Sequence, residues 1–316
     1  MTAVSAFCKT FAGILAISLL AFTFAGCGKK GEETEEETGK KATKQTEEKG
    51  AEDLRKGKAA YEIRDYKTAA MCFSLAAQDG NAEAQYRLGR CYWDGKGVDK
   101  NLDEYERWIR KAAEQGFPKA EIIYGDCFRS KRDKESLAEA ESWVKKGITG
   151  LIKEAKQGDA EAQYLLGGCY LCGVGVELDE AEGMKWFRKA AEQGDAEALY
   201  RLGICYQWGD GVDKNMEEAV KWYRKAADRD HVYACSDLGE CYENGNGVRE
   251  NKVEAVKWYR KAAELNNGFA CFRLGECYEN GKGVKRDWAE AVKWYRRAIE
   301  LGDTNADRAL RRFEKK

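Results

Sequence analysis

A period of 36 residues limits the folds open to this chain more than any other feature of its sequence. Residues 195–230 read DAEALYRLGICYQWGDGVDKNMEEAVKWYRKAADRD, and residues 231–266 and 267–302 follow in the same register. Residues 81–116 and 159–194 match the same pattern. Repetition at this length indicates a solenoid, in which each unit packs chiefly against its two neighbours.

Two sets of residues mark the period. The cysteine ladder comprises Cys91, Cys127, Cys169, Cys205, Cys241 and Cys277, and the tryptophan ladder comprises Trp108, Trp143, Trp186, Trp222, Trp258 and Trp294. Neighbouring cysteines are 36 residues apart, except for 42 between the second and the third. The extra residues fall in 117–158 and correspond to about two helical turns. We expect one lengthened helix over about 138–157, and a helix broken at Gly147 or Gly150 is the alternative.

Each unit is predicted to be a hairpin of two amphipathic helices. Ala198, Leu202 and Cys205 fall at i, i+4 and i+7 and form one apolar side of the first helix. Gly203 interrupts this helix, and glycine at the same place in the other units implies the close approach of a second helix. One hairpin cannot bury both apolar faces, whereas a stack of hairpins can.

The pattern resembles Sel1-like repeats, which are relatives of tetratricopeptide repeats. The resemblance rests on the Ala-Glu-Ala-x-Tyr-x-Leu-Gly opening, the Gly-x-Gly-Val loop and the Ala-x-x-Trp-Tyr-x-Lys-Ala-Ala close, over about residues 51–302. It implies an all-α, right-handed α/α superhelical solenoid and a non-catalytic scaffold or adaptor that binds proteins or peptides. The expected units cover about residues 51–80, 81–116, 117–158, 159–194, 195–230, 231–266 and 267–302, followed by a capping helix over 303–316.

Residues 1–27 have the pattern of a bacterial lipoprotein signal peptide. The apolar run of residues 11–24 has the length of a signal core and is short for a membrane span. It ends in Phe-Ala-Gly-Cys27, which resembles a lipobox, and acyl chains on Cys27 would anchor the protein to a membrane. Gly28 favours the outer membrane, by resemblance to enteric sorting rules. We therefore expect a lipid-anchored protein of the bacterial cell envelope, facing the periplasm or the surface; an ordinary signal peptide or an uncleaved anchor is the alternative.

Residues 28–50 are rich in lysine and glutamate and contain no large apolar side chain. Such a segment cannot bury enough surface to offset the entropy lost on ordering. We therefore expect a disordered, charged tether between the lipid anchor and the solenoid.

Few residues in the sequence suggest chemistry. The single histidine, His231, is expected at a surface position and offers neither a catalytic triad nor a metal cluster. The ladder cysteines are interpreted as small buried hydrophobes, although pairing of some cysteines stays open. Ser142 and Lys145 form a literal Ser-x-x-Lys, but the companion Lys-Thr-Gly motif is missing from the sequence. With 54 basic and 55 acidic residues, we expect no nucleic-acid partner, no metal and no cofactor.

The first helix of each unit is expected to line the concave side, by resemblance to tetratricopeptide stacks. Its positions opposite the core are the candidate partner-binding residues Arg87, Arg90, Ile123, Leu165, Arg201, Ile204, Trp208, Asp237, Glu240, Arg273 and Glu276. Along the stack this face changes from basic to apolar to acidic. Leu165, Ile204 and Trp208 are predicted to form a hydrophobic anchor, and the flanking charges to orient a bound peptide. The alternative is that these side chains pack against adjacent helices.

Three functional classes therefore remain at this stage. A protein-binding scaffold is the main hypothesis. A hydrolase acting on cell-wall or β-lactam substrates is an alternative that rests on associations reported for relatives. A passive structural spacer in the envelope is the third.

Overall fold

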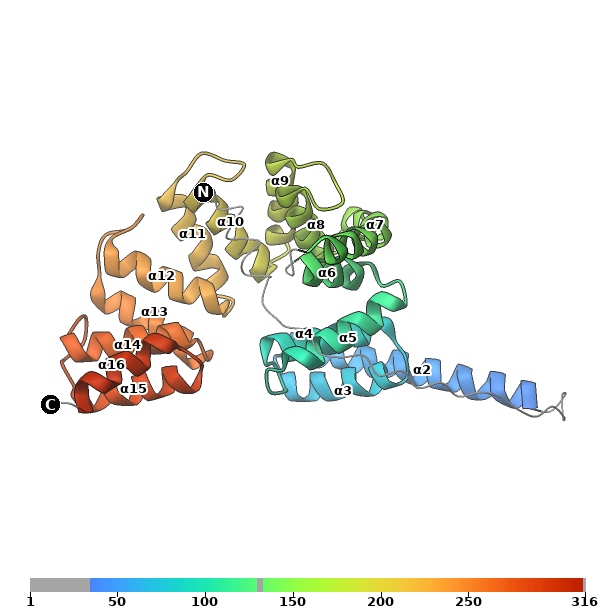
Figure 1. The fold of residues 1–316 in the computed structure, drawn as a ribbon, viewed down its shortest axis with the longest axis horizontal. Coiled ribbons are helices and arrows are strands. Elements are labelled where there is room, and N and C mark those ends of the chain that lie inside the picture. Colours follow the sequence, from blue (N-terminus) through green and yellow to red (C-terminus); the bar gives the residue numbers. More distant parts are fainter. Residues whose placement is uncertain (1–34, 130–132, 315–316) are drawn as a thin grey trace. The chain divides into compact units, whose positions relative to one another are not determined.

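The computed structural model describes residues 35–129 and 133–314, and within these ranges every regular element is an α-helix (Figure 1). The helices are α2 (Glu35–Glu62), α3 (Tyr66–Gln78), α4 (Ala82–Asp94), α5 (Leu102–Glu114), α6 (Pro118–Arg129), α7 (Lys134–Lys156), α8 (Ala160–Cys172), α9 (Glu180–Glu192), α10 (Ala196–Trp208), α11 (Met216–Ala227), α12 (Val232–Asn244), α13 (Lys252–Glu264), α14 (Gly268–Asn280), α15 (Trp288–Glu300) and α16 (Thr304–Glu314). The predicted all-α fold is confirmed.

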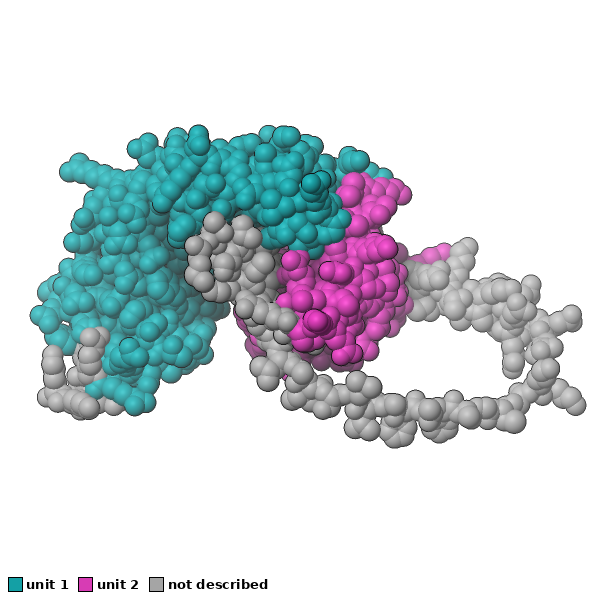
Figure 2. All heavy atoms as spheres, turned by 45° about the horizontal axis from the view of Figure 1, so that its top comes forward, with its two compact units in different colours: residues 1–3, 154–316 teal, residues 4–153 magenta. Residues whose placement is uncertain are grey.

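Two compact units make up the described part of the chain (Figure 2). Residues 35–153 form the N-terminal unit, and residues 154–314 form the C-terminal unit. An even-numbered helix A and the following odd-numbered helix B pack as one hairpin in the pairs α2–α3, α4–α5, α8–α9, α10–α11, α12–α13 and α14–α15. Helices α3, α5, α9, α11, α13 and α15 each also pack against the next helix along the chain. None of the helices in the described ranges is both long and apolar enough to cross a membrane.

Capping residues set the ends of these helices. The Asp195 carboxylate accepts a hydrogen bond from the backbone N–H of Ala198 (2.8 Å), and α10 ends at Gly209 in the left-handed conformation. At α12 the cap is His231, whose Nδ1 accepts from the N–H of Ala234 (3.1 Å). The expected surface position of His231 is wrong, because this ring is 7 % exposed. A buried imidazole can replace a capping carboxylate because its nitrogen accepts the same hydrogen bond.

The mid-helix glycines allow helix B to approach helix A, as predicted. A Cβ built on Gly203 would lie 2.5 Å from the ring of Tyr223, and one on Gly239 would lie 2.6 Å from the ring of Tyr259. No real Cβ contact is that short. Each glycine therefore contributes by removing atoms that would otherwise clash with the tyrosine of its own hairpin.

The cysteine ladder lies largely in the core. Cys205 is 1 % exposed, and burial raises the pKa of its thiol to about 12. Burial likewise raises the pKa of Cys91 to about 11. Cys235 and Cys271 are fully buried free thiols. The interpretation of these residues as small buried hydrophobes is confirmed, and such protonated thiols are poor nucleophiles.

Helix α7 confirms the lengthened helix of the irregular unit. It has 23 residues and continues without a break through Gly147 and Gly150, so the broken helix is wrong. Both glycines face the start of α6. A Cβ on Gly147 would lie 2.9 Å from the carbonyl oxygen of Pro118, and one on Gly150 would lie 2.5 Å from the Pro118 ring. Close packing thus explains these glycines.

The sequence prediction was correct at the C-terminal end of the solenoid and wrong at the N-terminal end. Helix α2 begins at Glu35, so residues 35–50 are helical where a disordered tether was expected. Lysine, glutamate and alanine are strong helix formers even without a core to bury. Residues 28–34 and Cys27 lie outside the described residues. At the other end, α16 is the expected capping helix, with Ala306 and Ala309 buried.

Candidate partner-binding face

One side of each of the helices α10, α12 and α14 in the C-terminal unit carries mainly polar and aromatic side chains. These residues follow the spacing i, i+4, i+7 and i+11, which places them on one side of an α-helix. We call this set the helix-A face: Glu197, Arg201, Ile204 and Trp208 on α10; Tyr233, Asp237, Glu240 and Asn244 on α12; Phe269, Arg273, Glu276 and Asn280 on α14.

Three aromatic side chains on this face remain accessible. Trp208 is 54 % exposed, Tyr233 58 % and Phe269 38 %. Trp208 was predicted from the sequence, whereas Tyr233 and Phe269 were missed. They lie one turn before Asp237 and Arg273, at a position where most other units have glutamate. Extending the same helical spacing by one turn toward the N-terminus would have found them.

Part of the predicted hydrophobic anchor does not exist at the surface. Ile123 is 2 % exposed and Leu165 is 8 % exposed, so both belong to the core, and their assignment to an accessible face is wrong. Aliphatic side chains at this position turn into the neighbouring helices, which removes their apolar surface from water. Ile204 is half-buried, and only Trp208 remains well exposed.

Polar contacts connect α10 to α12 beneath the aromatic residues. The Tyr200 hydroxyl donates to the Asp237 carboxylate (2.9 Å), and the Tyr200 ring stacks on His231 with centroids 4.4 Å apart. The Tyr233 ring lies 6.3 Å from that of Tyr200. Nε2 of His231 lies 3.4 Å from the Glu197 carboxylate. The exposed Tyr233 ring therefore packs near Tyr200, whose position is fixed by its hydrogen bond to Asp237 and its stacking on His231.

The two carboxylates that α12 contributes to the helix-A face, Asp237 and Glu240, form no ion pair within the described residues. Burial raises the pKa of Asp237 to about 6, although its hydrogen bond from Tyr200 acts in the opposite direction. Burial also raises the pKa of Glu240, which forms neither an ion pair nor a hydrogen bond with any residue of the described ranges. A cationic group brought to this position would stabilise both charges.

The acidic groups between α12 and α14 are instead already neutralised. Arg273 pairs with Glu243 (2.5 Å) and with Glu276 (2.6 Å), and Lys282 pairs with Glu243 (3.2 Å). The Tyr259 hydroxyl also donates to Glu243 (2.8 Å). The predicted acidic end of the face is thus confined to Asp237 and Glu240.

In the N-terminal unit the corresponding positions of α4 are charged and paired. Arg87 pairs with Glu83 (2.8 Å), and Asp94 pairs with Lys96 (3.1 Å). Arg90 is half-buried on the same helix. No large apolar side chain of α4 is exposed.

The structure assembles no catalytic machinery around the Ser-x-x-Lys sequence. Ser142 and Lys145 both lie on the exposed side of α7. The described residues also contain no group of three or more His, Cys, Asp or Glu side chains positioned to hold a metal ion. The chemistry available on the helix-A face is therefore that of recognition: aromatic contact, hydrogen bonding and charge.

Stacked helical hairpins whose core residues recur in every unit are the defining feature of α-helical repeat solenoids. The chain belongs to the Sel1 repeat family. Six repeats match, at residues 55–81, 82–117, 160–195, 196–231, 232–267 and 268–303. The unmatched stretch between the second and the third contains α6 and the lengthened α7. Sel1 repeat proteins are generally protein-interaction scaffolds.

Two solved structures illustrate the likeness. A Sel1 repeat protein from Oxalobacter formigenes is 31% identical, with 88% of this chain and 80% of that chain covered and a TM-score of 0.52. A protective antigen of uropathogenic Escherichia coli strains, described as displaying an SLR fold, is 34% identical, with 76% of this chain covered and a TM-score of 0.50. The match spans 50% of that antigen's length.

Proposed function

We propose that this chain is a non-catalytic scaffold that binds a protein or peptide through the helix-A face of its C-terminal unit. The observation that carries the proposal is the exposure of Trp208, Tyr233 and Phe269 on the A helices of three consecutive repeats, α10, α12 and α14. Exposed aromatic residues grouped on one surface are typical of interaction sites, where they supply much of the binding free energy.

The charges beside these aromatic residues support the same function. Asp237 and Glu240 form no ion pair with any residue of the described ranges, although the charge of Arg273 lowers the pKa of Glu240 against the larger effect of burial. A lysine or arginine of a bound segment would complete them, while its neighbouring apolar side chains contact Trp208 or Tyr233. In such a complex the aromatic residues would supply most of the affinity for the bound segment, and the carboxylates would fix its orientation.

A two-stage binding experiment tests this proposal. Partners are captured from envelope extracts, identified and purified, and their affinity is then measured against the wild-type chain and the Trp208→Ala/Tyr233→Ala variant. We expect the double variant to bind at least about 30-fold more weakly, because a hot-spot side chain contributes about 2 kcal/mol or more. The matched control is Val253→Ala, which removes a side chain that is 56 % exposed on helix B.

The outcome separates a scaffold from a passive spacer. Equal affinity of the double variant and the wild type would remove the helix-A face from the proposal. A failure of any purified protein to bind the wild type would favour the spacer. The melting temperatures of the variants are compared in parallel, so that a loss of binding is not confused with unfolding.

We further infer that the scaffold is tethered to the bacterial cell envelope, with the outer membrane as its location. The Phe-Ala-Gly-Cys27 sequence after an apolar run supports this placement. In Cys27→Ser, metabolic labelling with a radioactive fatty acid should be lost, and the protein should no longer fractionate with outer membranes. Continued labelling of the variant would contradict the inference.

A further inference from the structure

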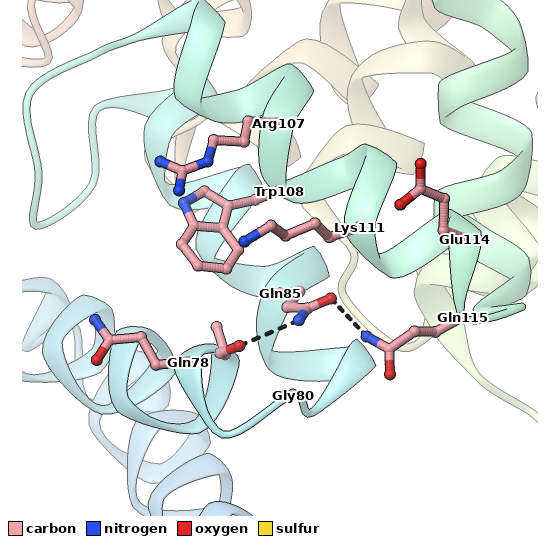
Figure 3. A pocket seen from close by; sticks show the side chains of 9 residues that line it. Gln78, Gly80, Gln85, Arg107, Trp108, Lys111, Glu114 and Gln115 are labelled. Carbon is pink, nitrogen blue, oxygen red and sulfur yellow. Dashed lines mark hydrogen bonds between the residues drawn. The ribbon is translucent and has the colours of Figure 1, made fainter. Parts of the chain in front are cut away.

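A cavity of about 610 Å³ lies on the N-terminal unit and shares no residue with the helix-A face (Figure 3). The residues that matter for its chemistry come from α4, from α5 and from the turn after α3: Gly80, Gln85, Arg107, Trp108, Lys111 and Gln115. Its volume falls within the range of about 300–1,000 Å³ that is typical of small-ligand sites.

A chain of amide groups fixes one wall of the cavity. Gln85 is 6 % exposed, and its side-chain nitrogen donates to the carbonyl oxygen of Ala77 (3.1 Å). The side-chain oxygen of Gln85 accepts from the side-chain nitrogen of Gln115 (2.7 Å), as the dashed lines in Figure 3 show. These bonds engage both the nitrogen and the oxygen of the Gln85 side chain and hold Gln115 in place, so this wall is preorganised.

Lys111 provides an uncompensated positive charge in the cavity. Its ammonium lies 4.5 Å from the centroid of the Trp108 ring, and the side chain is half-buried. Lys111 forms no ion pair and no hydrogen bond with any residue in the described ranges. Arg107, in contrast, pairs with Glu104 (3.0 Å). The free cation of this cavity is therefore Lys111.

The repeat itself shows which group is missing here. Lys261 of α13 stands at the position of Lys111, and Asp230 stands at the position of Gly80. There the Lys261 ammonium pairs with the Asp230 carboxylate (2.8 Å) and donates to the carbonyl oxygen of Ala227 (2.5 Å). A loop carboxylate thus satisfies the lysine in this one repeat, whereas Lys111 has glycine at that loop position, as Lys189 and Lys225 do with Gly158 and Gly194.

We propose that this cavity binds the carboxylate group of a ligand, at the position where the Asp230 side chain meets Lys261 in the later repeat. There is room for it, because a Cβ built on Gly80 would have no heavy atom within 4 Å. Glu114 also lines the cavity, but its carboxylate pairs with Arg110 (2.9 Å). The later repeat keeps a glutamate at the same place, Glu264, beside its own lysine–carboxylate pair.

The ligand class is a small carboxylate-bearing molecule or segment, such as the end of a peptide chain or an acidic side chain. Its carboxylate would pair with Lys111, and the remaining volume would take a group of about amino-acid size. This site is separate from the helix-A face, so the two proposals stand or fall independently.

Three probes distinguish the sources of the carboxylate: acetyl-Ala-Ala-Ala with a free carboxyl end, the same peptide as its amide, and acetyl-Ala-Glu-Ala-amide. Binding is followed by NMR at the Trp108 indole N–H and at the side-chain amides of Gln85 and Gln115. We expect saturable shifts with a carboxylate probe and none with the neutral amide. A preference between the two carboxylate probes then identifies a chain end or an acidic side chain.

Variants of the full chain test the assignment to Lys111 and Gly80. Lys111→Gln should weaken binding at least about tenfold, since a hydrogen bond to a charged group contributes about 1.5–3 kcal/mol. Gly80→Asp should block the site from within, as Asp230 does. Gly80→Ala is the matched control, because it places a side chain at the same backbone angle (φ 90°) without a carboxylate, and it should still bind.

The reverse change, Asp230→Gly, should free Lys261 and produce new shifts at the Trp258 indole. Equal shifts with the acid and the amide, or binding unchanged in both Lys111→Gln and Gly80→Asp, would overturn the proposal. Unaltered melting temperatures of Lys111→Gln and Gly80→Ala would show that lost binding reflects the site and not the fold.

Discussion

Helices α4 and α12 occupy the same place in the repeat but present different surfaces. On α4 the positions of the helix-A face are charged and matched by nearby opposite charges, as in the Glu83–Arg87 pair. On α12 they carry an exposed tyrosine and the two carboxylates Asp237 and Glu240, which lack cations in the described ranges. The shared core sets the position of the face, and the unshared residues decide whether the face is already satisfied.

A contrast in the opposite direction is found beside the B helices α5 and α13, where the unpaired charge belongs to the N-terminal unit. There the Lys261–Asp230 pair closes one groove of the C-terminal unit, whereas Lys111 of the N-terminal unit lies beside a glycine, as Lys189 and Lys225 of the C-terminal unit do. Comparing equivalent positions of the repeats therefore shows where a charge has a partner within the chain. Positions that every unit satisfies internally maintain the stack, and positions whose charge only some units satisfy are candidate binding sites.

The largest expected effect comes from breaking the scaffold that both faces share. Gly239→Val would place side-chain atoms within the Tyr259 ring, whose nearest carbon is 2.6 Å from an ideal Cβ. We expect a loss of about 3 kcal/mol in unfolding free energy, measured by urea denaturation, since overpacking a close contact typically costs about 1–3 kcal/mol or more. Lys257→Val, on the exposed side of α13, is the control for the helix propensity of valine. Equal stability of the two variants would contradict the close-packing role.

The next effect is on binding alone. Tyr233→Glu/Phe269→Glu gives α12 and α14 the residue that α4 has at this position, Glu83. We expect the affinity of a partner purified on the wild type to fall by at least about tenfold, with little change in melting temperature because both rings are exposed. The reciprocal Glu83→Tyr should leave that affinity unchanged. A larger effect of Glu83→Tyr would place the partner on the N-terminal unit instead.

The fold was predictable from the sequence because every core position recurs in several units. The mid-helix glycines and the lengthened α7 followed directly from that recurrence. The helix-A face was only partly predictable. Helical spacing shows which residues share one side of a helix, but it does not show how exposed their side chains are. Leu165 and Arg201 share one position in the repeat, yet the first is buried while the second is half-exposed. The proposed site at Lys111 emerges only from comparison with the Lys261–Asp230 pair of a later repeat, which no pattern within a single unit reveals.

A smaller effect concerns the pH dependence of stability. The pKa of Asp237 is about 6 in the folded chain and about 3.9 in an unfolded one. The folded state therefore binds this proton more tightly, so stability from this group is greatest below about pH 4 and declines as the pH rises to about 6. Glu240 raises this pKa and His231 lowers it. Asp237→Asn should remove about 2–3 kcal/mol of this decline, because about two pKa units correspond to that free energy. The decline is measured as the wild-type minus variant difference in urea unfolding between pH 4 and pH 7.5. An identical decline in both proteins would contradict the assignment.

The smallest expected effect tests whether the exposed side of α4 is held by ion pairs rather than by packing. The Glu83 side chain pairs with Arg87 (2.8 Å) and with Lys58 (2.5 Å), and all three are at least partly exposed. Glu83→Gln should cost about 0.5 kcal/mol of unfolding free energy at low salt, because exposed pairs contribute little, and the difference should shrink toward zero in about 1 M salt. A loss that persists in high salt would mean that Glu83 acts through packing. The contrast between α4 and α12 would then be one of shape, and the unpaired carboxylates of α12 would no longer distinguish the two faces.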